Sequence, residues 1–326
     1  MRFASFVAGG KPRFGLSPDE KRIYDLSGLL QQRYPTAPVL VCLLDLIEAG
    51  GTAWRRVQEL QSEIQARPEG FEHYRADEVQ FLAPVTRPSK ICCIALNNSA
   101  NTERIMRGPK HPAMFVKGAN SLVGHRAQIH YKKIYGRVHP EPELAVVIGK
   151  PTKDVAVADA YEAVFGYTVH NDVTSPTMRA EDTFHYRAIH PKNGNPREIE
   201  YVDTWVSYPG RYKGCDTFSC MGPWLVTRDE IANPHDLVIE CRENDELITS
   251  DNTANLFYKV PEVIAFLSGY MTLLPGDIIS MGTALKASAG GGGGAVQNIK
   301  LEKPGTKVSI SIERIGTLEN TSLLTG

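Results

Sequence analysis

The stretch VHPEPELAVVIG, residues 138–149, predicts an apolar β-strand that begins beside two carboxylates. Side chains two residues apart leave the same face of a strand, so Glu141 and Glu143 are expected to point together. Two like charges held side by side call for a counter-ion. A divalent cation such as Mg²⁺ or Mn²⁺ prefers oxygen ligands and keeps positions open for water and substrate. The stretch therefore predicts a cation site, although most such pairs at strand ends are solvated surface.

A third carboxylate, Asp172, ends a second strand-like run, YTVHND at residues 167–172. Together with Glu141 and Glu143 it would place three carboxylates on one face of a cation. The opposite positions of the ion would stay open for water or substrate.

The composition is that of a globular protein. With 326 residues, 42% of them hydrophobic, the chain can bury a full core and is expected to hold one large and one smaller domain. Its net charge is −1 and it has no Lys/Arg block, which argues against nucleic acid or an anionic membrane as partner. The N-terminus reaches Gly9 too soon for a signal peptide, and the longest apolar run, residues 39–47, is too short for a bilayer. We therefore expect a cytoplasmic protein.

Two common kinds of site are not supported. The six cysteines lack C-x-x-C spacing, which disfavours a zinc ribbon or a redox dithiol and leaves reduced thiols packed as small hydrophobic side chains. The five glycines at residues 290–294 are not followed by Lys-Ser/Thr, so a nucleotide loop is not indicated and a surface loop is expected.

The pattern along the chain predicts an α+β, β-rich fold. Residues 1–80 are expected to form a small N-terminal α/β domain with helices at 39–49 and 54–65, and residues 81–326 the catalytic domain. The second part opens with a buried strand at 91–96. Strands then dominate, with helices at 158–164 and 261–270 and a half-buried, alternating strand at 307–313.

Six sequence words occur in the order typical of the fumarylacetoacetate hydrolase family, which the chain resembles over residues 82–320. Any one word would be weak, whereas six in order are specific. The words are FVK with SLVG (115–117 and 121–124), EPELAVVIGK (141–150), GYTVHNDVT (166–174), KGCDTF (213–218), MGPWLV (221–226) and PGDIISMGT (275–283).

The resemblance implies a mixed β-roll catalytic domain, packed as a homodimer, with one Mg²⁺ or Mn²⁺ per subunit. Family members act on 2-oxo acids or β-diketones by C–C hydrolysis, decarboxylation, hydration or dehydration, and tautomerisation. By position, the family's metal ligands match Glu141, Glu143 and Asp172. The other matched positions are the active-site Lys213 and the substrate-contacting Thr283, with Gly282 and Lys117 as further expected substrate contacts.

This chemistry suits such a site. A 2-oxo acid chelates a cation through its carboxylate and keto oxygens, and the metal stabilises the enolate formed when a neighbouring bond breaks. Lys213 could place a positive charge at the developing oxyanion, and Thr283, beside Gly282, could offer a hydroxyl or backbone N–H at close approach. Without the motif, Lys213 would be taken for a surface lysine.

One departure from the family concerns the base. Family hydrolases carry a His, with a Glu three residues later, after the first core strand, where the His activates water. Here Asn101 and Arg104 stand at those positions, and Asn cannot take a proton at neutral pH. Glu103, one residue out of register, is a candidate replacement, with a solvated helix residue as the alternative.

A second departure is a long segment, residues 180–211, between Asp172 and Lys213. It is expected to fold over the pocket, with His185 as a replacement base or Arg187 as a carboxylate clamp. The alternative is a structural or dimer-contact loop. His139 and His170 are further candidate bases, each equally compatible with a packed or ligand-supporting histidine.

Three functions remain open at this point. The favoured one is a metal-dependent hydrolase that cleaves a C–C bond in an acylpyruvate or related β-diketone or 2-oxo acid, in catabolism of aromatic or other carbon compounds. The second is a lyase or isomerase with the same metal-enolate chemistry, such as a 2-oxo acid hydratase, sugar-acid dehydratase or decarboxylase. The third is a non-catalytic binder of a 2-oxo acid.

Overall fold

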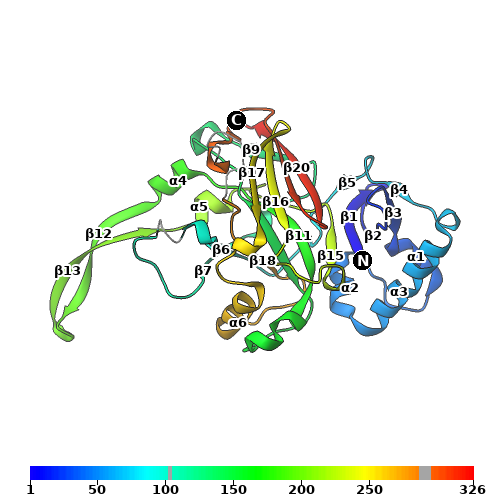
Figure 1. Cartoon of the computed structure of the whole chain (residues 1–326), viewed down its shortest axis with the longest axis horizontal. Helices are drawn as coiled ribbons and strands as arrows, with labels where there is room; N and C mark the ends of the chain where they lie inside the picture. Colours follow the sequence, from blue (N-terminus) through cyan, green and yellow to red (C-terminus); the bar gives the residue numbers. More distant parts are fainter. Residues whose placement is uncertain (102–104, 286–294) are drawn as a thin grey trace.

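The computed structural model describes residues 1–101, 105–285 and 295–326. Figure 1 shows a strand-rich body with the N-terminal part at one end and a long hairpin projecting at the other, which confirms the expected α+β, β-rich class. The strands are β1 Arg2–Ala8, β2 Lys11–Leu16, β3 Arg22–Asp25, β4 Tyr74–Arg75, β5 Gln80–Phe81, β6 Ile91–Ala95, β7 Ala113–Lys117, β8 Leu122–Val123, β9 Gln128–Tyr131, β10 Pro142–Ile148, β11 Val164–Asp172, β12 Thr183–Lys192, β13 Asn195–Ser207, β14 Ser219–Met221, β15 Leu225–Thr227, β16 Val238–Glu243, β17 Glu246–Asn252, β18 Ile278–Ser280, β19 Lys307–Ile312 and β20 Gly316–Leu324. The α-helices are α1 Leu26–Arg33, α2 Leu43–Ala49, α3 Gly51–Ala66, α4 Pro176–Glu181, α5 Gly210–Gly214 and α6 Val260–Tyr270.

The strand predicted from the opening stretch is β10, and it lies inside the main sheet. All of its residues are buried, and it pairs antiparallel with β11 on one side and β18 on the other. The path through this sheet is β4-β3-β2-β1-β15-β11-β10-β18-β6-β7. A strand covered on both faces needs apolar side chains in both directions, which explains the uninterrupted run LAVVI at residues 144–148.

A second sheet, in the order β17-β16-β19-β20-β9, covers the main one. Val146 and Val169 of the main sheet share one buried cluster with Ile239, Ile310 and Leu318 of the second. Sheets that pack face to face enclose a core in this way. The alternating strand predicted at 307–313 is confirmed as β19.

The N-terminal part packs α1, α2 and α3 against β1 to β3, around buried side chains that include Phe3, Phe14 and Leu46. β1 also pairs antiparallel with β15, with Phe3 opposite Leu225. Hydrogen bonds therefore join this part to the main sheet, and the division into domains at residues 80 and 81 stays a prediction.

Some predicted helix boundaries differ from the observed ones. α2 begins at Leu43, not at residue 39, because the Asp45 carboxylate accepts hydrogen bonds from the N–H groups of Val41 (2.7 Å) and Cys42 (3.0 Å) and so fixes the first turn. The predicted helix at 158–164 is instead a 3₁₀ helix, Val157–Ala163. The predicted helix at 261–270 is confirmed as α6.

The segment between Asp172 and Lys213 forms a two-stranded hairpin of β12 and β13, which we call the arm. Arg211 holds its root, donating to Glu181 (2.7 Å) and Asp182 (2.8 Å). The arm extends away from the body (Figure 1). The expectation that this segment folds over the pocket of its own chain is therefore wrong.

The cysteines fit the expected reduced, packed state. Cys92, Cys93, Cys220 and Cys241 are buried, and all six are free thiols. Among the described residues, no helix combines the length and apolar character that crossing a membrane requires.

Candidate metal centre

Two neighbouring strands bring the three predicted carboxylates together. In the register of β10 and β11, Glu143 lies opposite His170, so Asp172, two residues on, is level with Glu141. The Asp172 N–H donates to the Glu141 carbonyl at 2.9 Å and closes this corner of the sheet. One oxygen from each of Glu141, Glu143 and Asp172 lies within 4.8 Å of the others.

The pKa of Glu143 reflects the crowding of these charges. Burial, reinforced by the carboxylates of Asp172 and Glu141, raises the pKa of Glu143 to about 8. A carboxyl group in this position holds its charge poorly without a cation nearby.

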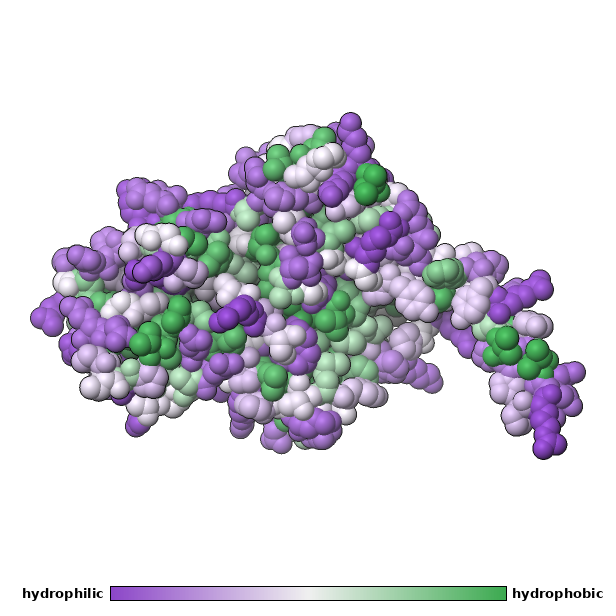
Figure 2. Space-filling view, turned by 180° about the vertical axis from the view of Figure 1, so that it is seen from behind, coloured by the Kyte–Doolittle hydropathy of each residue, from purple (hydrophilic) through white to green (hydrophobic). Residues whose placement is uncertain are grey.

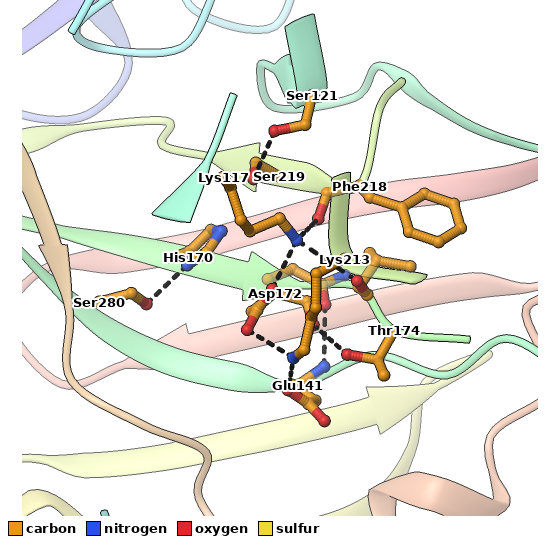
Figure 3. A network of polar contacts seen from close by, with 12 residues as sticks. Lys117, Ser121, Glu141, His170, Asp172, Thr174, Lys213, Phe218, Ser219 and Ser280 are labelled. Carbon is orange, nitrogen blue, oxygen red and sulfur yellow. Dashed lines mark hydrogen bonds and ion pairs between the residues drawn. The ribbon is translucent and has the colours of Figure 1, made fainter. Parts of the chain in front are cut away.

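Lys117 supports Asp172 from the inside of the sheet. Its side chain is fully buried, and its ammonium donates to Asp172 Oδ1 (2.5 Å) and to the carbonyls of Phe218 (2.6 Å) and Val173 (3.3 Å) (Figure 3). Burial alone would raise the pKa of Asp172, but the ammonium groups of Lys117 and Lys213 hold it well below its usual range. The geometry favours a role for Lys117 in positioning Asp172, in place of the predicted substrate contact, because no surface of its side chain is open.

Lys213 approaches the same carboxylates from α5. Its Nζ donates to Glu141 Oε2 (2.5 Å) and Asp172 Oδ2 (2.7 Å) (Figure 3). The same Nζ lies 4.9 Å from the centre of the Phe115 ring. Burial by itself would lower the pKa of Lys213, yet the neighbouring carboxylates hold it above its ordinary value. The Lys213 side chain is 9% exposed and that of its partner Glu141 is 16% exposed, compared with 1% for Asp172.

Glu143 is fixed by donors to both of its oxygens. Ser280 (2.5 Å) and the Gly282 N–H (3.1 Å) donate to Oε2, and the Thr283 hydroxyl donates to Oε1 at 3.0 Å. His170 Nδ1 lies 2.6 Å from the Ser280 oxygen. Ser280 donates its single hydroxyl proton to the Glu143 carboxylate. The hydrogen between Ser280 and His170 must therefore be carried by His170 Nδ1, which donates to Ser280.

Sequence reasoning missed this chain of hydrogen bonds. The sequence leaves His170 open as a base, a packed histidine or a ligand-supporting histidine, and it does not single out Ser280 within PGDIISMGT. Burial lowers the pKa of His170 to about 3, which keeps the ring neutral. The available signal was the place of Ser280 on β18, because that strand adjoins β10 and ends beside Glu143.

The residues present fit a hard divalent cation. Three carboxylates face two ammonium groups, so the fully ionised cluster carries an excess negative charge that a dication would reverse. All the candidate ligand atoms are oxygens, which Mg²⁺ and Mn²⁺ prefer. The donors around Glu143 would orient a ligand, as outer hydrogen bonds do in metal sites.

Other predicted site residues lie elsewhere. His185 and Arg187 are on the arm, exposed to solvent, and the structure does not bring them to the carboxylates of the same chain. The physical reason is that β12 and β13 pair only with each other and leave the body. Glu103 lies outside the described residues. Thr283 and Gly282 are at the site, where their contacts are to Glu143.

Asn101 lies in a buried segment beside the site. It ends the 3₁₀ helix Ser99–Asn101 after β6 and is 3% exposed. In the same segment, the Asn97 and Asn98 side chains donate to the carbonyls of Met281 (2.7 Å) and Thr283 (3.3 Å), respectively. The Asn98 amide therefore contacts Thr283, which holds Glu143, and three residues further on the resemblance places Asn101 where the family's hydrolases carry a base.

Comparisons with known proteins agree with this architecture. A mitochondrial oxaloacetate tautomerase of Bos taurus is 35% identical over 325 residues, which cover 98% of this chain and 91% of the relative. A fumarylacetoacetate hydrolase from Exiguobacterium antarcticum superposes with a TM-score of 0.72 at 25% identity, with all of both chains covered.

A third similar protein was solved with its metal. The maleylpyruvate hydrolase of Sphingobium sp. SYK-6, in complex with manganese(II) and pyruvate, has a TM-score of 0.69 at 26% identity, again over the whole of both chains. The model of the fumarylacetoacetate hydrolase C-terminal domain matches residues 90–322. The chain belongs to the fumarylacetoacetate hydrolase family.

Proposed function

We propose that this protein is a divalent-metal-dependent tautomerase that interconverts the keto and enol forms of a 2-oxo acid, with oxaloacetate as the first substrate to test. The observation that carries the proposal is the position of Lys213, whose ammonium lies between the carboxylates of Glu141 and Asp172 and donates to both. Of the functions that the sequence leaves open, this proposal favours isomerisation over C–C hydrolysis.

Tautomerisation moves one proton between a carbon and a neighbouring oxygen. It consumes no water and breaks no C–C bond, so it does not require a base that activates water. A bound Mg²⁺ or Mn²⁺ would supply Lewis-acid polarisation of the chelating substrate oxygens. Lys213, whose pKa lies above its ordinary value, would stay protonated and stabilise the negative charge on the reacting oxygen, while the proton that leaves the carbon passes to bulk water and bulk water returns a proton to the oxygen. Thr283 and Ser280 would keep Glu143 oriented throughout.

Two features support tautomerisation over hydrolysis. Asn101 occupies the place of the water-activating histidine, and His170 is neutral, fully buried and bonded to Ser280. The similarity to oxaloacetate tautomerases over nearly the whole chain points the same way.

Hydrolysis of an acylpyruvate is the second candidate. Its support is the similarity in fold to the maleylpyruvate hydrolase that binds manganese(II) and pyruvate. Pyruvate is itself a 2-oxo acid, so both candidates share the same recognition chemistry and differ in the bond that changes.

The test follows freshly dissolved enol-oxaloacetate by ultraviolet absorbance and by ¹H NMR, with Mg²⁺ or Mn²⁺ present. We expect metal-dependent conversion that is abolished by EDTA and by Glu143→Gln. Glu162→Gln, an exposed carboxylate paired with Lys150, is the matched control and should leave the rate unchanged. Cleavage of an acylpyruvate into two acids, without acceleration of enol conversion, would instead establish the hydrolase.

A further inference from the structure

Most charged side chains of this protein lie at its surface, and Figure 2 shows hydrophilic residues spread over the body. Asp251, in β17 of the second sheet, is an exception and is only 6% exposed. An aspartate is normally buried in this way only when hydrogen bonds or charges satisfy it. The groups that satisfy Asp251 therefore indicate what its burial is for.

Both oxygens of Asp251 accept hydrogen bonds. Oδ2 accepts from the Asn98 side-chain amide (2.9 Å) and from the Leu285 N–H (3.0 Å). Oδ1 accepts from the Asn252 N–H (2.8 Å) and from the Asn255 side-chain amide (2.6 Å). Asn98 follows β6 and Leu285 follows β18, so one side chain of the second sheet joins two segments that leave the main sheet.

These contacts suit an ionised carboxylate. Burial would raise the pKa of Asp251, but the surrounding N–H donors, led by that of Leu285, hold it below its ordinary value. A carboxylate only accepts hydrogen bonds, whereas an amide of the same shape both donates and accepts. The charge and the shape of the side chain are therefore both used.

The contacts lead from Asp251 to Glu143 through a single residue of each segment. The Asn98 amide that donates to Asp251 also donates to the Thr283 carbonyl at 3.3 Å. The Thr283 hydroxyl then donates to Glu143 Oε1 at 3.0 Å. Leu285, two residues beyond Thr283, is held by Asp251 directly. Asp251 thus fixes the backbone on which Thr283 is carried.

The two segments also pack closely against each other. The Asn97 side chain donates to the Met281 carbonyl at 2.7 Å. Gly282 has φ +104°, and a Cβ at this position would lie 2.8 Å from the Asn97 Cβ. Close-packed interiors transmit small shifts, so a displacement of one segment moves the other.

We propose that Asp251 is a positioning residue for the metal centre, which holds residues 97–98 and 281–285 so that Thr283 keeps Glu143 oriented. Asp251 acts through Asn98 and Leu285 and is not itself one of the proposed metal ligands. The inference rests on the metal centre of the proposed function. It holds for a tautomerase and a hydrolase alike.

Asp251→Asn tests this role with the full-length chain. Each oxygen of Asp251 accepts from a backbone N–H, of Leu285 or of Asn252, that cannot reverse. Either orientation of the new amide therefore sets its NH₂ group against a donor. We expect the affinity for Mn²⁺, measured by calorimetric titration, to fall about tenfold, the lower end for a residue that supports a metal ligand. In the metal-free protein, amide hydrogen exchange at residues 281–285 should accelerate while β10 stays protected.

Thr283→Val removes the hydroxyl through which Asp251 would act. If the path is correct, adding Asp251→Asn to Thr283→Val should lower the Mn²⁺ affinity by no more than about twofold further, because coupled residues are not additive. A general structural role would lower the affinity by the same factor in both backgrounds, and that result would overturn the proposal. No substrate is present in these titrations, so an error in the assigned reaction would leave their outcome unchanged.

The matched control is Asp236→Asn. The Asp236 carboxylate is exposed and accepts from the Asn252 side-chain amide at 3.2 Å. Its replacement should leave both the Mn²⁺ affinity and the exchange at residues 281–285 as in the wild type. A loss of affinity equal to that of Asp251→Asn would contradict a specific role for Asp251.

Asn98→Leu provides a second variant in case Asp251→Asn fails to fold by circular dichroism. It removes the link to the Thr283 carbonyl, while the Leu285 N–H remains on Asp251. We expect Mn²⁺ affinity to fall several-fold here too. Wild-type affinity in either variant, once folded, would overturn the proposal.

Discussion

The carboxylate cluster and the arm each contain an ion pair between residues of two strands, in opposite surroundings. Lys117 and Asp172 are 0% and 1% exposed, and Lys117 is held by two carbonyls as well as the carboxylate. Arg187 and Asp203 are 76% and 71% exposed and 3.6 Å apart. A buried pair must be fully satisfied and so fixes geometry, whereas an exposed pair contributes little to the fold and stays available to a partner.

Removing the buried ammonium group of Lys117 should have the largest effect on stability. Lys117→Met leaves Asp172 buried with one ammonium in place of two and removes a donor from the carbonyls of Val173 and Phe218, of which Phe218 keeps the Val173 N–H. We expect a loss of about 3 kcal/mol in the free energy of unfolding, at the lower end for a broken buried pair because Lys213 remains. Urea denaturation in the presence of EDTA measures it. A loss below about 1 kcal/mol would contradict the expected difference between this buried ion pair and the exposed pair on the arm.

Lys213 should matter for activity more than for folding. Lys213→Met removes the ammonium that bonds Glu141 and Asp172, and we expect kcat to fall by about 10²–10³, as for the loss of one preorganised charge at a reacting oxygen. The unfolding midpoint of the metal-loaded protein should change little, because a bound cation would balance Glu141 and Asp172. A variant with normal kcat would exclude Lys213 from the reaction.

Substitutions of Ser280 test whether a residue that orients Glu143, without binding the metal itself, contributes to metal affinity. Ser280→Ala removes one donor to Glu143 and the partner of His170, and should weaken Mn²⁺ binding by about 10- to 100-fold. Ser280→Thr keeps the hydroxyl and should restore part of the affinity. Calorimetric titration with Mn²⁺ provides the measurement, and equal affinities for all three proteins would contradict the positioning role.

The exposed pair should give the smallest effect on stability. Arg187→Ala is expected to change the free energy of unfolding of the monomer by less than about 0.5 kcal/mol, because the pair is solvated and long. Thermal unfolding of the dilute protein, compared with the wild type at the same concentration, measures this contribution. A loss comparable to that of Lys117→Met would show that the arm depends on its internal pair.

The central strands and the carboxylates were predictable because local patterns specify them. The buried run after Glu143 gave β10, and the spacing of Glu141 and Glu143 placed both at its start. Asp172 could be added because it ends a second strand-like run, and the resemblance then matches it to a metal ligand. These features depend on short stretches whose backbone geometry is known once a strand is recognised.

Long-range features were harder to predict. The direction of the arm depends on whether β12 and β13 meet the body, and their sequence is compatible with a lid as well as a projecting hairpin. The role of Lys117 was missed because full burial of a lysine depends on three acceptors brought together by separate segments. The 3₁₀ helix at Val157–Ala163 was predicted as α-helical, since short apolar spacing does not distinguish the two.

Direct titration with Mn²⁺ tests the central claim that the buried carboxylates form a cation site. Electron paramagnetic resonance of the free ion should show one Mn²⁺ bound per wild-type chain. The site should be lost in Glu143→Gln and retained in the exposed control Glu162→Gln. Equal Mn²⁺ binding by wild type and Glu143→Gln would contradict the assignment of Glu143 as a ligand.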